Sequence, residues 1–439
     1  MRPLPLLPAL CMCLAVAQGI IPAPQHISYN PADPLPPLPQ VEGAYTLRYD
    51  ARKGEWEVDA HDDAGRRHAA TTAAALVREN GGTPPPHVAV CDYPRYAWRG
   101  LHLDVSRHFF PPEVVREYID RMAELKLNRL HLHLTDGPGW RIEIKKYPRL
   151  TSFAAWRKDL GVEDWDWPTI QIGPNHPKVE GGFYTQDEMR ALVEYARGRG
   201  IMIVPEIDMP GHSYAAIAAY PEIGRADFPQ MGLRGGDVLD TANPRSLDFA
   251  RDVLTELMQV FPEGTPIHLG GDEVPPQFAT ARQQRDWIQQ LVDFCREHGR
   301  EAIVWDEAAT NGVQRQTTMV WHASGTESLF QSGAPLILCP CSHFYFDYRP
   351  AEDDPGTVPA VITLEKVFGY TVPQGNIRGI QANLWTEHIT TRERLFHMAF
   401  PRAAALSERA WGSPKRPFAD FLRDLKGDVI HPAERGSAP

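Results

Sequence analysis

Two adjacent acids, Asp272 and Glu273, follow a short apolar run and are suited by type and spacing to do chemistry. The run Thr265–Leu269 predicts a buried strand, and Gly270-Gly271 lets the backbone bend where that strand ends. Such a bend is needed because neighbouring side chains on a straight strand point to opposite faces. Two carboxyls in one cavity can divide the work of hydrolysis, one protonating a leaving group while the other stays charged. An isolated Asp-Glu pair is more typical of a solvent-exposed acidic turn. Features elsewhere in the chain must therefore distinguish a catalytic pair from such a turn.

Length and composition limit the kinds of protein that this chain can be. The chain has 439 residues, of which 43% are hydrophobic, which is enough for one large domain and a smaller one. The net charge of -11 argues against non-specific binding to nucleic acid, so we expect no nucleic-acid partner. The sequence contains no run of eighteen apolar residues, so we expect no transmembrane helix.

The first residues resemble an export signal. Arg2 precedes the apolar stretch Ala9–Ala17, and Ala15-Val16-Ala17 fits the small-x-small rule for cleavage. We therefore expect a signal peptide over residues 1–18 and a secreted or periplasmic protein. The alternative is a misassigned start site, which would leave a cytoplasmic location open. Cleavage would remove two of the six cysteines and leave too few for a disulfide framework.

The segment 19–94 predicts a small α+β domain that begins with a proline-rich stretch. We expect no regular structure over Pro22–Gln40, because prolines are dense there. Alternating patterns then predict three strands and one helix. In chain order these are Ala44–Tyr49, Glu55–Asp59, the helix Thr71–Glu79, and Val88–Val90.

The segment 95–425 predicts a closed barrel, and residues 426–439 a C-terminal tail. Its short apolar strands are Gly100–Ser106, Arg129–Asp136, Ile201–Asp208, Pro266–Asp272, Ala302–Asp306, Met319–His322, Pro335–Cys339 and Gly379–Trp385. Helical patterns fill most gaps and follow the last strand: Glu113–Leu125, Gln186–Gly198, Ser246–Phe261, Ala279–Glu297 and Arg392–Trp411. Eight strands that alternate with helices are typical of a (β/α)8 TIM barrel. The alternative, a doubly wound open sheet, would favour an early glycine-rich phosphate loop, and no G-x-G-x-x-G opens a helix.

Polar residues gather at the carboxyl ends of these strands. They are Asp136, Asp208, Asp272-Glu273, Trp305-Asp306, Trp321-His322, Tyr345-Phe346-Asp347 and Trp385-Thr386-Glu387. In a TIM barrel those ends meet at one face, where catalytic groups lie. Tryptophan together with acid is typical of a sugar site, and glycoside hydrolysis requires an acid and a second group that carries positive charge. The residues alone therefore favour a glycosidase.

Several motifs give a more specific resemblance. They are Trp98–Phe109, Leu127–Asp136, Pro205–His212, His268–Glu273, Val304–Glu307, Tyr345–Asp347, Asn383–Glu387 and Phe400–Arg402. In this order they resemble glycoside hydrolase family 20, the β-N-acetylhexosaminidases, from about Trp98 to Trp411. The unit Val41–Pro94 resembles a shortened version of that family's N-terminal α+β domain. One loop departs from the family, because Gly137-Pro138-Gly139-Trp140 replaces its usual second acid and glutamine before Gly-Trp.

The resemblance implies an exo-acting enzyme that retains configuration with help from its substrate. The acetamido oxygen of the sugar attacks its own anomeric carbon and forms an oxazolinium. Glu273 would be the general acid and then the base, and Asp272 would hold the acetamido N–H and balance the positive charge. Tyr345 would orient the acetamido oxygen, and Asp136 and His212 would form a relay behind Glu273.

The resemblance also implies the substrate contacts. Three tryptophans would wall the sugar pocket and three charged residues would hold hydroxyls of the terminal sugar. These are Trp305, Trp321 and Trp385, and Arg99, Asp347 and Glu387. The expected partner is a glycan or glycoconjugate with terminal β-linked N-acetylglucosamine or N-acetylgalactosamine. The insertion Trp156–Gly182, with its Trp165 and Trp167, is expected to cover one edge of the pocket.

Two other functions stay open at this stage. In a metal-dependent barrel hydrolase, His131 and His133 share a strand face and could recruit His212 and His322. A carbohydrate-binding protein with an inactive site would bind N-acetylglucosamine without turnover. We expect no cofactor and no metal. We also expect His268 to be a packed core residue, and Asp104 and Arg107 to form an ion pair under the barrel mouth.

Overall fold

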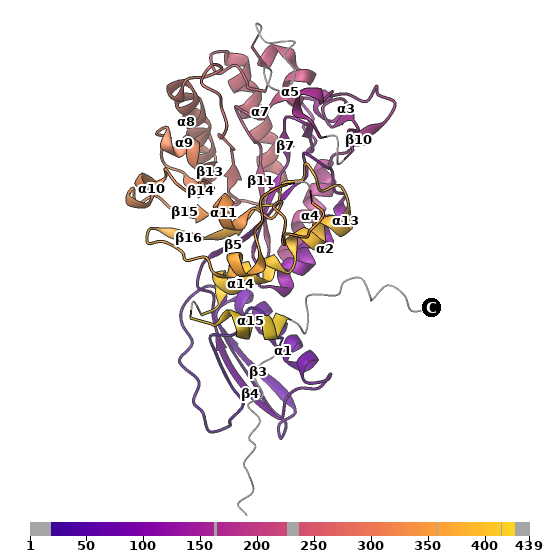
Figure 1. The fold of residues 1–439 in the computed structure, drawn as a ribbon. Helices are drawn as coiled ribbons and strands as arrows, with labels where there is room; N and C mark the ends of the chain where they lie inside the picture. The colour runs from indigo at the N-terminus through magenta and orange to yellow at the C-terminus, as the bar shows by residue number, and fades with distance from the viewer. Residues whose placement is uncertain (1–18, 162–164, 226–236, 357, 414, 426–439) are drawn as a thin grey trace, which may run out of the picture. The chain divides into compact units, whose positions relative to one another are not determined.

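The computed structural model describes residues 19–161, 165–225, 237–356, 358–413 and 415–425 (Figure 1). These residues form two compact units. One unit combines the chain up to Tyr93 with the segment that begins at Lys415, and the other spans Pro94–Pro414. The expected export signal, residues 1–18, and the expected tail, residues 426–439, lie outside the described residues.

The smaller unit is built around an antiparallel sheet of four strands in the order β1-β4-β2-β3. The elements are β1 (His26–Ser28), β2 (Tyr45–Asp50), β3 (Glu55–Ala60), α1 (Asp63–Glu79), β4 (His87–Asp92) and α15 (Phe418–Leu425). Alternate residues of β2, Tyr45 and Leu47, are fully buried, as expected for a strand with one face on the core.

Three features of this unit differ from the sequence-based expectations. Strand β1 lies inside the proline-rich stretch expected to lack regular structure, because it pairs with β4, far along the chain. Helix α1 begins eight residues earlier than expected, where the side chain of Asp62 accepts a hydrogen bond from the Gly65 N–H and caps the helix. Helix α15 groups with this unit, so the barrel that was expected to reach residue 425 ends before Lys415.

The larger unit is a closed barrel of eight parallel strands, each near its expected place. The order around the barrel is β11-β12-β13-β14-β15-β16-β5-β6. The strands are β5 (Trp98–Asp104), β6 (Arg129–His133), β11 (Met202–Glu206), β12 (Ile267–His268), β13 (Ala302–Trp305), β14 (Thr317–Val320), β15 (Leu336–Leu338) and β16 (Ile377–Ala382). Buried side chains from five of these strands or their ends form one interior cluster: Trp98, Val204, Ile303, Trp305, Met319, Ile337 and Cys339. The expected TIM barrel is therefore confirmed.

Amphipathic helices cover the outside of the barrel (Figure 1). The main ones are α2 (Pro112–Glu124), α4 (Gln186–Gly198), α7 (Pro244–Val260), α8 (Ala281–Glu297), α13 (Arg392–Ala399) and α14 (Arg402–Trp411). Capping boxes at Thr185 and Thr280 fix the starts of α4 and α8. The single helix expected over Arg392–Trp411 is two helices, because Pro401 lacks a backbone N–H and clashes with a continuing helical turn.

Shorter elements fill the loops between strands and helices. They are β7 (Thr135–Asp136), β8 (Gly139–Trp140), α3 (Arg149–Ser152), β9 (Trp156–Lys158), the 3-10 helix η1 (Trp167–Thr169), β10 (Val179–Gly181), α5 (Tyr214–Ala219), the 3-10 helix η2 (Pro221–Ile223), α9 (Asp306–Thr310), α10 (Glu327–Gln331), α11 (Cys341–Phe344) and α12 (Leu364–Phe368). Strands β9 and β10 pair antiparallel within the expected insertion.

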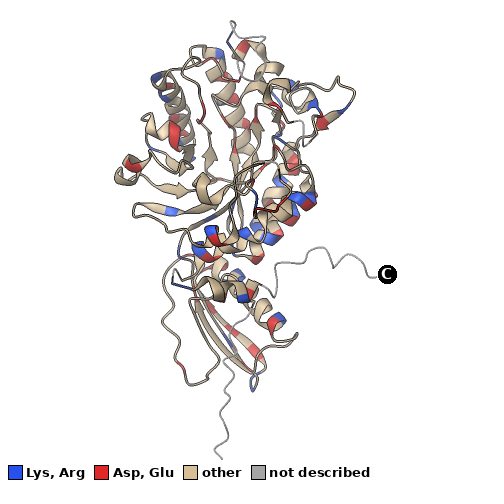
Figure 2. Ribbon diagram, viewed as in Figure 1, with Lys and Arg blue, Asp and Glu red and all other residues tan. Residues whose placement is uncertain are grey.

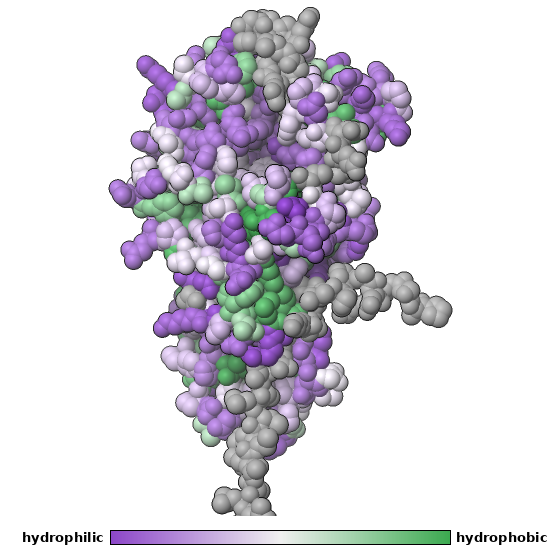
Figure 3. Space-filling model, in the orientation of Figure 1, coloured by the Kyte–Doolittle hydropathy of each residue, from purple (hydrophilic) through white to green (hydrophobic). Residues whose placement is uncertain are grey.

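Charged residues are concentrated on the outer helices and loops, whereas the barrel strands carry few (Figure 2). Hydrophilic residues also predominate on the face of the barrel seen in Figure 3. None of the helices in the described part of the chain is both long and apolar enough to cross a lipid bilayer.

Candidate active site

The bend after β12 brings the two acids to the same side, as expected. Gly270 and Gly271 both have positive φ, at 68° and 92°, and Glu273 follows with a φ of 48°. A Cβ on Gly270 would lie 1.7 Å from the carboxylate of Asp208, so only glycine fits there. After this turn, Oδ2 of Asp272 lies 3.9 Å and Oε2 of Glu273 lies 3.4 Å from the same atom, Nε2 of His212.

His212 connects the acids to Asp136, in the arrangement expected for a relay. Its Nδ1 lies 3.3 Å from the carboxylate of Asp136, while its Nε2 faces Glu273. His212 has a φ of 53° and its side chain is 12% exposed, whereas that of Glu273 is 60% exposed. The histidine is therefore enclosed between carboxylates, and the outer one is open to solvent.

Arg107 anchors the other side of Asp136. Its guanidinium lies 2.7 Å from Asp136, 3.2 Å from Asp104 and 3.8 Å from Glu387. The same group lies over the ring of Trp385, 4.8 Å from the ring centroid. The expected ion pair with Asp104 is confirmed, but Arg107 also reaches the acids of the barrel mouth. It is therefore a site residue that the sequence-based assignment missed.

The assignment of Arg99 to substrate hydroxyls is wrong. Arg99 lies near the beginning of β5, at the barrel end opposite to the acids, because parallel strands place their carboxyl ends together. Its guanidinium donates hydrogen bonds to the carbonyls of Lys126 and Tyr96, at 2.8 Å and 2.9 Å, and lies over the ring of Trp411. These contacts make Arg99 a structural residue of the barrel floor.

Aromatic side chains surround the approach to the acids. Tyr345 is stacked near Trp321, with ring centroids 6.1 Å apart and planes at 24°, and lies 6.1 Å from Trp385. Trp305 differs from these, because it is 1% exposed and its Nε1 donates a 2.8 Å hydrogen bond to Glu206. It belongs to the barrel interior and contacts the site through Trp385, 6.3 Å away.

A cavity of about 290 Å³ opens beside Tyr345 and Trp385, close to the lower end of the range of small-molecule sites. Its lining is Trp165, Trp167, Tyr345, Asp347, Tyr348, Val358, Trp385, Glu387, His388 and Ile389. Asp347 and Glu387 thus lie together, as expected. The insertion between β9 and β10 contributes Trp165 and Trp167, so the expectation that it covers one edge of the pocket is confirmed.

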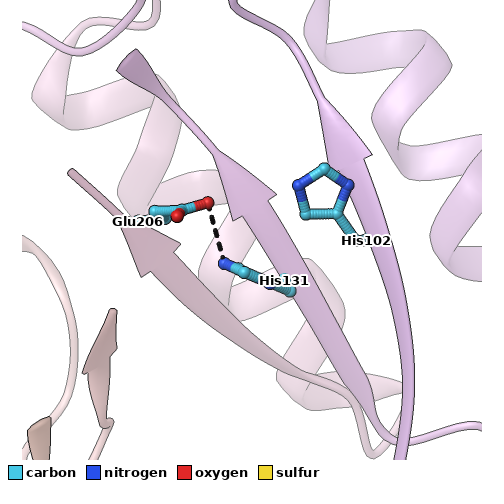
Figure 4. Close-up of side chains that lie close together, drawn as sticks. All are labelled: His102, His131 and Glu206. Carbon is cyan, nitrogen blue, oxygen red and sulfur yellow. Dashed lines mark ion pairs between the residues drawn. The ribbon is translucent and has the colours of Figure 1, made fainter. Parts of the chain in front are cut away.

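Beneath the site, a buried network is centred on Glu206 of β11. Its carboxylate receives contacts from His133 at 2.5 Å, from His131 and His268 at 3.1 Å, and from the indole of Trp305. Figure 4 shows His102, His131 and Glu206 on three neighbouring strands. His268 is fully buried, as expected for a core residue.

His133 joins this network to the relay. Its Nε2 lies 3.0 Å from Asp136, and its Nδ1 faces Glu206. Burial lowers the pKa of His133, but the carboxylates of Glu206 and Asp136 outweigh this effect and raise it to about 10. The imidazolium therefore holds Asp136 as a carboxylate, together with Arg107. A glutamate inside an apolar strand was the available sequence signal for this network.

Histidines and carboxylates also form the groups that a metal would need. Three groups, within the described ranges, place ligand atoms within 4.8 Å of one another: His102-His131-Glu206, His133-Glu206-Asp208 and Asp136-Asp208-His212. Contacts among these residues, such as His131–Glu206, His133–Glu206 and His212–Asp136, account for much of this closeness. His322, which the metal-dependent alternative could recruit, pairs instead with Asp306 at 3.0 Å and belongs to none of the three groups.

The protonation of the ligand-free site follows from these contacts. A hydrogen bond with His212 holds the pKa of Glu273 below its ordinary value, although burial opposes the shift. Burial and the neighbouring Asp208 raise the pKa of Asp272 well above its ordinary value. Burial lowers the pKa of His212, but Asp136 and Asp208 outweigh it and hold the pKa well above 6.5. In the ligand-free site these shifts favour the protonated form of His212, the neutral form of Asp272 and the charged form of Glu273.

Comparisons with known proteins agree with this geometry. Residues 96–414 match the sequence model of glycosyl hydrolase family 20, catalytic domain. The chain is 34% identical to a beta-hexosaminidase of Vibrio furnissii over 83% of its own length and 65% of that relative. It is 31% identical to a beta-hexosaminidase of Akkermansia muciniphila over 97% and 93% of the two chains.

A solved structure gives the same result. The crystal structure of a GH20 exo beta-N-acetylglucosaminidase from Vibrio harveyi in complex with N-acetylglucosamine superposes with a TM-score of 0.79 at 28% identity, covering 94% of this chain and 76% of that one. The match over the whole barrel, from Tyr96 to residue 414, shows that this chain belongs to glycoside hydrolase family 20.

Proposed function

We propose that this chain is an exo-acting β-N-acetylhexosaminidase that releases terminal N-acetylglucosamine or N-acetylgalactosamine. The observation that carries the proposal is that Asp272 and Glu273 lie on the same side and reach one histidine, beside a cavity lined by Tyr345 and Trp385. The relatives named beta-hexosaminidase support the same activity.

The mechanism that we propose begins with proton transfer to the leaving group. Glu273 donates a proton to the glycosidic oxygen as the bond from that oxygen to the anomeric carbon breaks. A bound sugar would cover the exposed carboxyl of Glu273 and remove water from it, which raises its pKa. The proton held on His212, 3.4 Å away, can then pass to Glu273 without coming from solvent.

The acetamido group of the substrate acts as the nucleophile. Its oxygen forms a bond to the anomeric carbon as the leaving group departs, which gives an oxazolinium and retains configuration after a second displacement. Asp272 accepts a hydrogen bond from the acetamido N–H. This hydrogen bond and the positive charge on the ring favour its ionised form, so Asp272 gives up its proton to solvent as the sugar binds. Tyr345 donates to the acetamido oxygen and orients it. Water then attacks the anomeric carbon, the bond to the acetamido oxygen breaks, and Glu273 takes the proton of that water.

The substrate is a glycan or glycoconjugate that ends in a β-linked N-acetylhexosamine. Asp347 and Glu387 line the cavity and would accept hydrogen bonds from the hydroxyls of the terminal sugar. Arg107, in place of Arg99, is the cation beside Glu387. Since Arg2 and the small residues around Ala17 fit an export signal, we further propose that the protein acts outside the cytoplasm.

The test is a panel of aryl β-glycosides. Aryl β-N-acetylglucosaminide should be cleaved and the matching β-glucoside should not, because the glucoside lacks an intramolecular nucleophile of high effective molarity. Proton NMR of the first product should show the β-anomer. Comparable rates on the two glycosides, or an α-anomer as first product, would refute the substrate-assisted mechanism.

A further inference from the structure

Two tryptophans of the β9–β10 insertion line the substrate cavity on the side of Asp347 and Glu387. Trp165 and Trp167 lie with their ring centroids 5.4 Å apart and their planes at 89°. The cavity lining includes both indoles, Asp347 and Glu387, but neither Asp272 nor Glu273. The tryptophans therefore stand at the end of the pocket that faces the sugar hydroxyls and away from the acid that meets the leaving group.

An arginine of the insertion and a histidine that follows β5 contact the ring of Trp165. Its ring packs against the guanidinium of Arg157, 5.0 Å from the ring centroid, and against the ring of His108, 5.5 Å away. Arg157 is 1% exposed and forms an ion pair with Glu180 of β10. The position of this indole is thus fixed by a buried ion pair at the base of the insertion.

Trp167 is fixed by the central arginine of the site. The guanidinium of Arg107 lies 5.4 Å from the centroid of Trp167 and 4.8 Å from that of Trp385. Contacts of this kind are attractive because the face of an indole ring is electron-rich. Because Arg107 also holds Glu387, the insertion is coupled to the residue that would accept a substrate hydroxyl.

The lining of the cavity contains one unsatisfied donor and one unsatisfied acceptor. Across the described ranges, Nε1 of Trp165 and Oδ1 of Asp347 are buried and have no hydrogen-bond partner. Buried polar atoms without partners are rare and costly in proteins. A hydroxyl group donates one hydrogen bond and accepts others, so the hydroxyls of a bound sugar can satisfy both atoms.

We propose that Trp165 and Trp167 form the specificity wall of the pocket: Trp165 donates to a ring hydroxyl remote from the anomeric carbon, and the two indoles exclude substituents at that end. This inference rests on the proposed function and narrows its substrate to hexosamines whose remote hydroxyls are free. The enzyme would remove single terminal sugars, and a second sugar attached beyond the wall would not fit.

The first test measures binding and needs no turnover. Affinities of N-acetylglucosamine and its 3-, 4- and 6-deoxy analogues are measured by calorimetry on the wild type, Trp165→Phe and Trp156→Phe. The Phe variant at position 165 keeps the ring but loses the N–H, so it should bind N-acetylglucosamine ~10-fold more weakly. For one deoxy analogue the two losses should not add, because the same hydrogen bond is removed twice.

Trp156→Phe is the matched control, since its indole N–H donates to the Thr151 carbonyl at 3.0 Å and Trp156 does not line the cavity. It should bind all four sugars as the wild type does. Two results would overturn the hydrogen bond that we assign. One is equal affinity of Trp165→Phe and the wild type for N-acetylglucosamine; the other is that, for every deoxy analogue, the losses of binding free energy from the mutation and from the missing hydroxyl add.

The second test addresses the wall. Aryl β-chitobioside is given to the wild type and to the double variant Trp165→Ala/Trp167→Ala, and the first sugar released is identified by mass. The wild type should release N-acetylglucosamine only, whereas the variant should also release the disaccharide. If the wild type cleaves aryl N-acetylglucosaminide but the variant still releases only monosaccharide, the wall is refuted and the proposed function stands. A wild type that neither cleaves nor binds these sugars refutes the proposed function and the wall with it.

Discussion

The proton that reaches the leaving group is predicted to be stored on His212, and this assignment has a measurable pH signature. The change is His212→Asn, because asparagine does not titrate in this range and tolerates the positive φ of 53° at that position better than most residues. The proton remains available in the wild type until the pH rises through the raised pKa of His212. In the variant only Glu273 can supply it, and activity should be lost near the ordinary pKa of a carboxylic acid.

The size of the shift follows from the distances. An opposite charge 3.3 Å away, as on Asp136, stabilises an imidazolium by about 5 kcal/mol at an effective dielectric constant of ~20 and by about 1 kcal/mol in water. The charge of Glu273 at 3.4 Å counts for less, because that side chain is 60% exposed and screened by solvent. Burial of the imidazolium opposes both contributions, and Asp208, Asp272 and Asp237 also face it. The attraction of the carboxylates outweighs burial, so the pKa of His212 lies well above the ordinary histidine value.

The assay is the pH dependence of kcat/KM on an aryl N-acetylglucosaminide with a poor leaving group. The basic limb of the wild type should lie above pH 6.5, and in His212→Asn it should move by at least two pH units to lower pH. A substrate with an activated leaving group is the control, since it requires little protonation and its basic limb should move less. Coincident basic limbs for the two proteins on the poor leaving group would show that His212 does not hold the proton.

Three further predictions concern other residues of the barrel. Glu273→Gln should slow cleavage of substrates with poor leaving groups by ~10²–10⁴-fold and of activated substrates by less, whereas Asp272→Asn should slow both classes alike. If the rate depends more steeply on leaving-group pKa in Asp272→Asn than in Glu273→Gln, the two roles are reversed. Arg107→Met should abolish activity and lower the free energy of unfolding by ~3–5 kcal/mol, because it leaves buried carboxylates unpaired. Arg99→Met should lower the free energy of unfolding by ~1.5–3 kcal/mol and leave kcat/KM unchanged; urea unfolding and steady-state kinetics measure both effects. Incubation with EDTA should leave activity within error, and a loss that zinc restores would favour the metal-dependent alternative.

The sequence predicted the barrel well because its strands are short apolar runs with polar ends. That pattern predicts that Asp136, Asp272 and Glu387 lie at one face of the barrel, and the parallel pairing of the strands confirms it. Local sequence patterns did not predict strands that form through long-range pairing. An example is β1, which is a strand because it pairs with β4, far along the chain. The apolar pattern of Arg392–Trp411 continues across Pro401 and therefore predicted one helix, although proline usually ends a helix.

The misplaced arginine shows why the site was harder to predict than the fold. Arg99 and Arg107 belong to the same motif, and they differ in which end of β5 they occupy. The acids of the other strands lie at the carboxyl ends of the strands, as expected, because each follows its own apolar run. Arg107 stands beyond a tight turn, where the carboxylate of Asp104 accepts from the N–H groups of Ser106 and Arg107. That turn directs Arg107 back over the mouth, and strand alternation alone does not reveal it.

The last helix of the small unit, α15, comes from the far end of the chain. This order of elements has a consequence for biosynthesis. Strands β1 to β4 and α1 leave the ribosome early, but α15 follows only after the entire barrel has been made. Its buried residues Phe421 and Leu425 are therefore missing from the unit for most of translation. Domains generally fold as units while the chain is synthesised, and unfinished ones expose apolar surface that aggregates. Chaperones would thus be needed most by the small unit, and shortened chains that end before Lys415 should accumulate as insoluble material even though their barrel is complete.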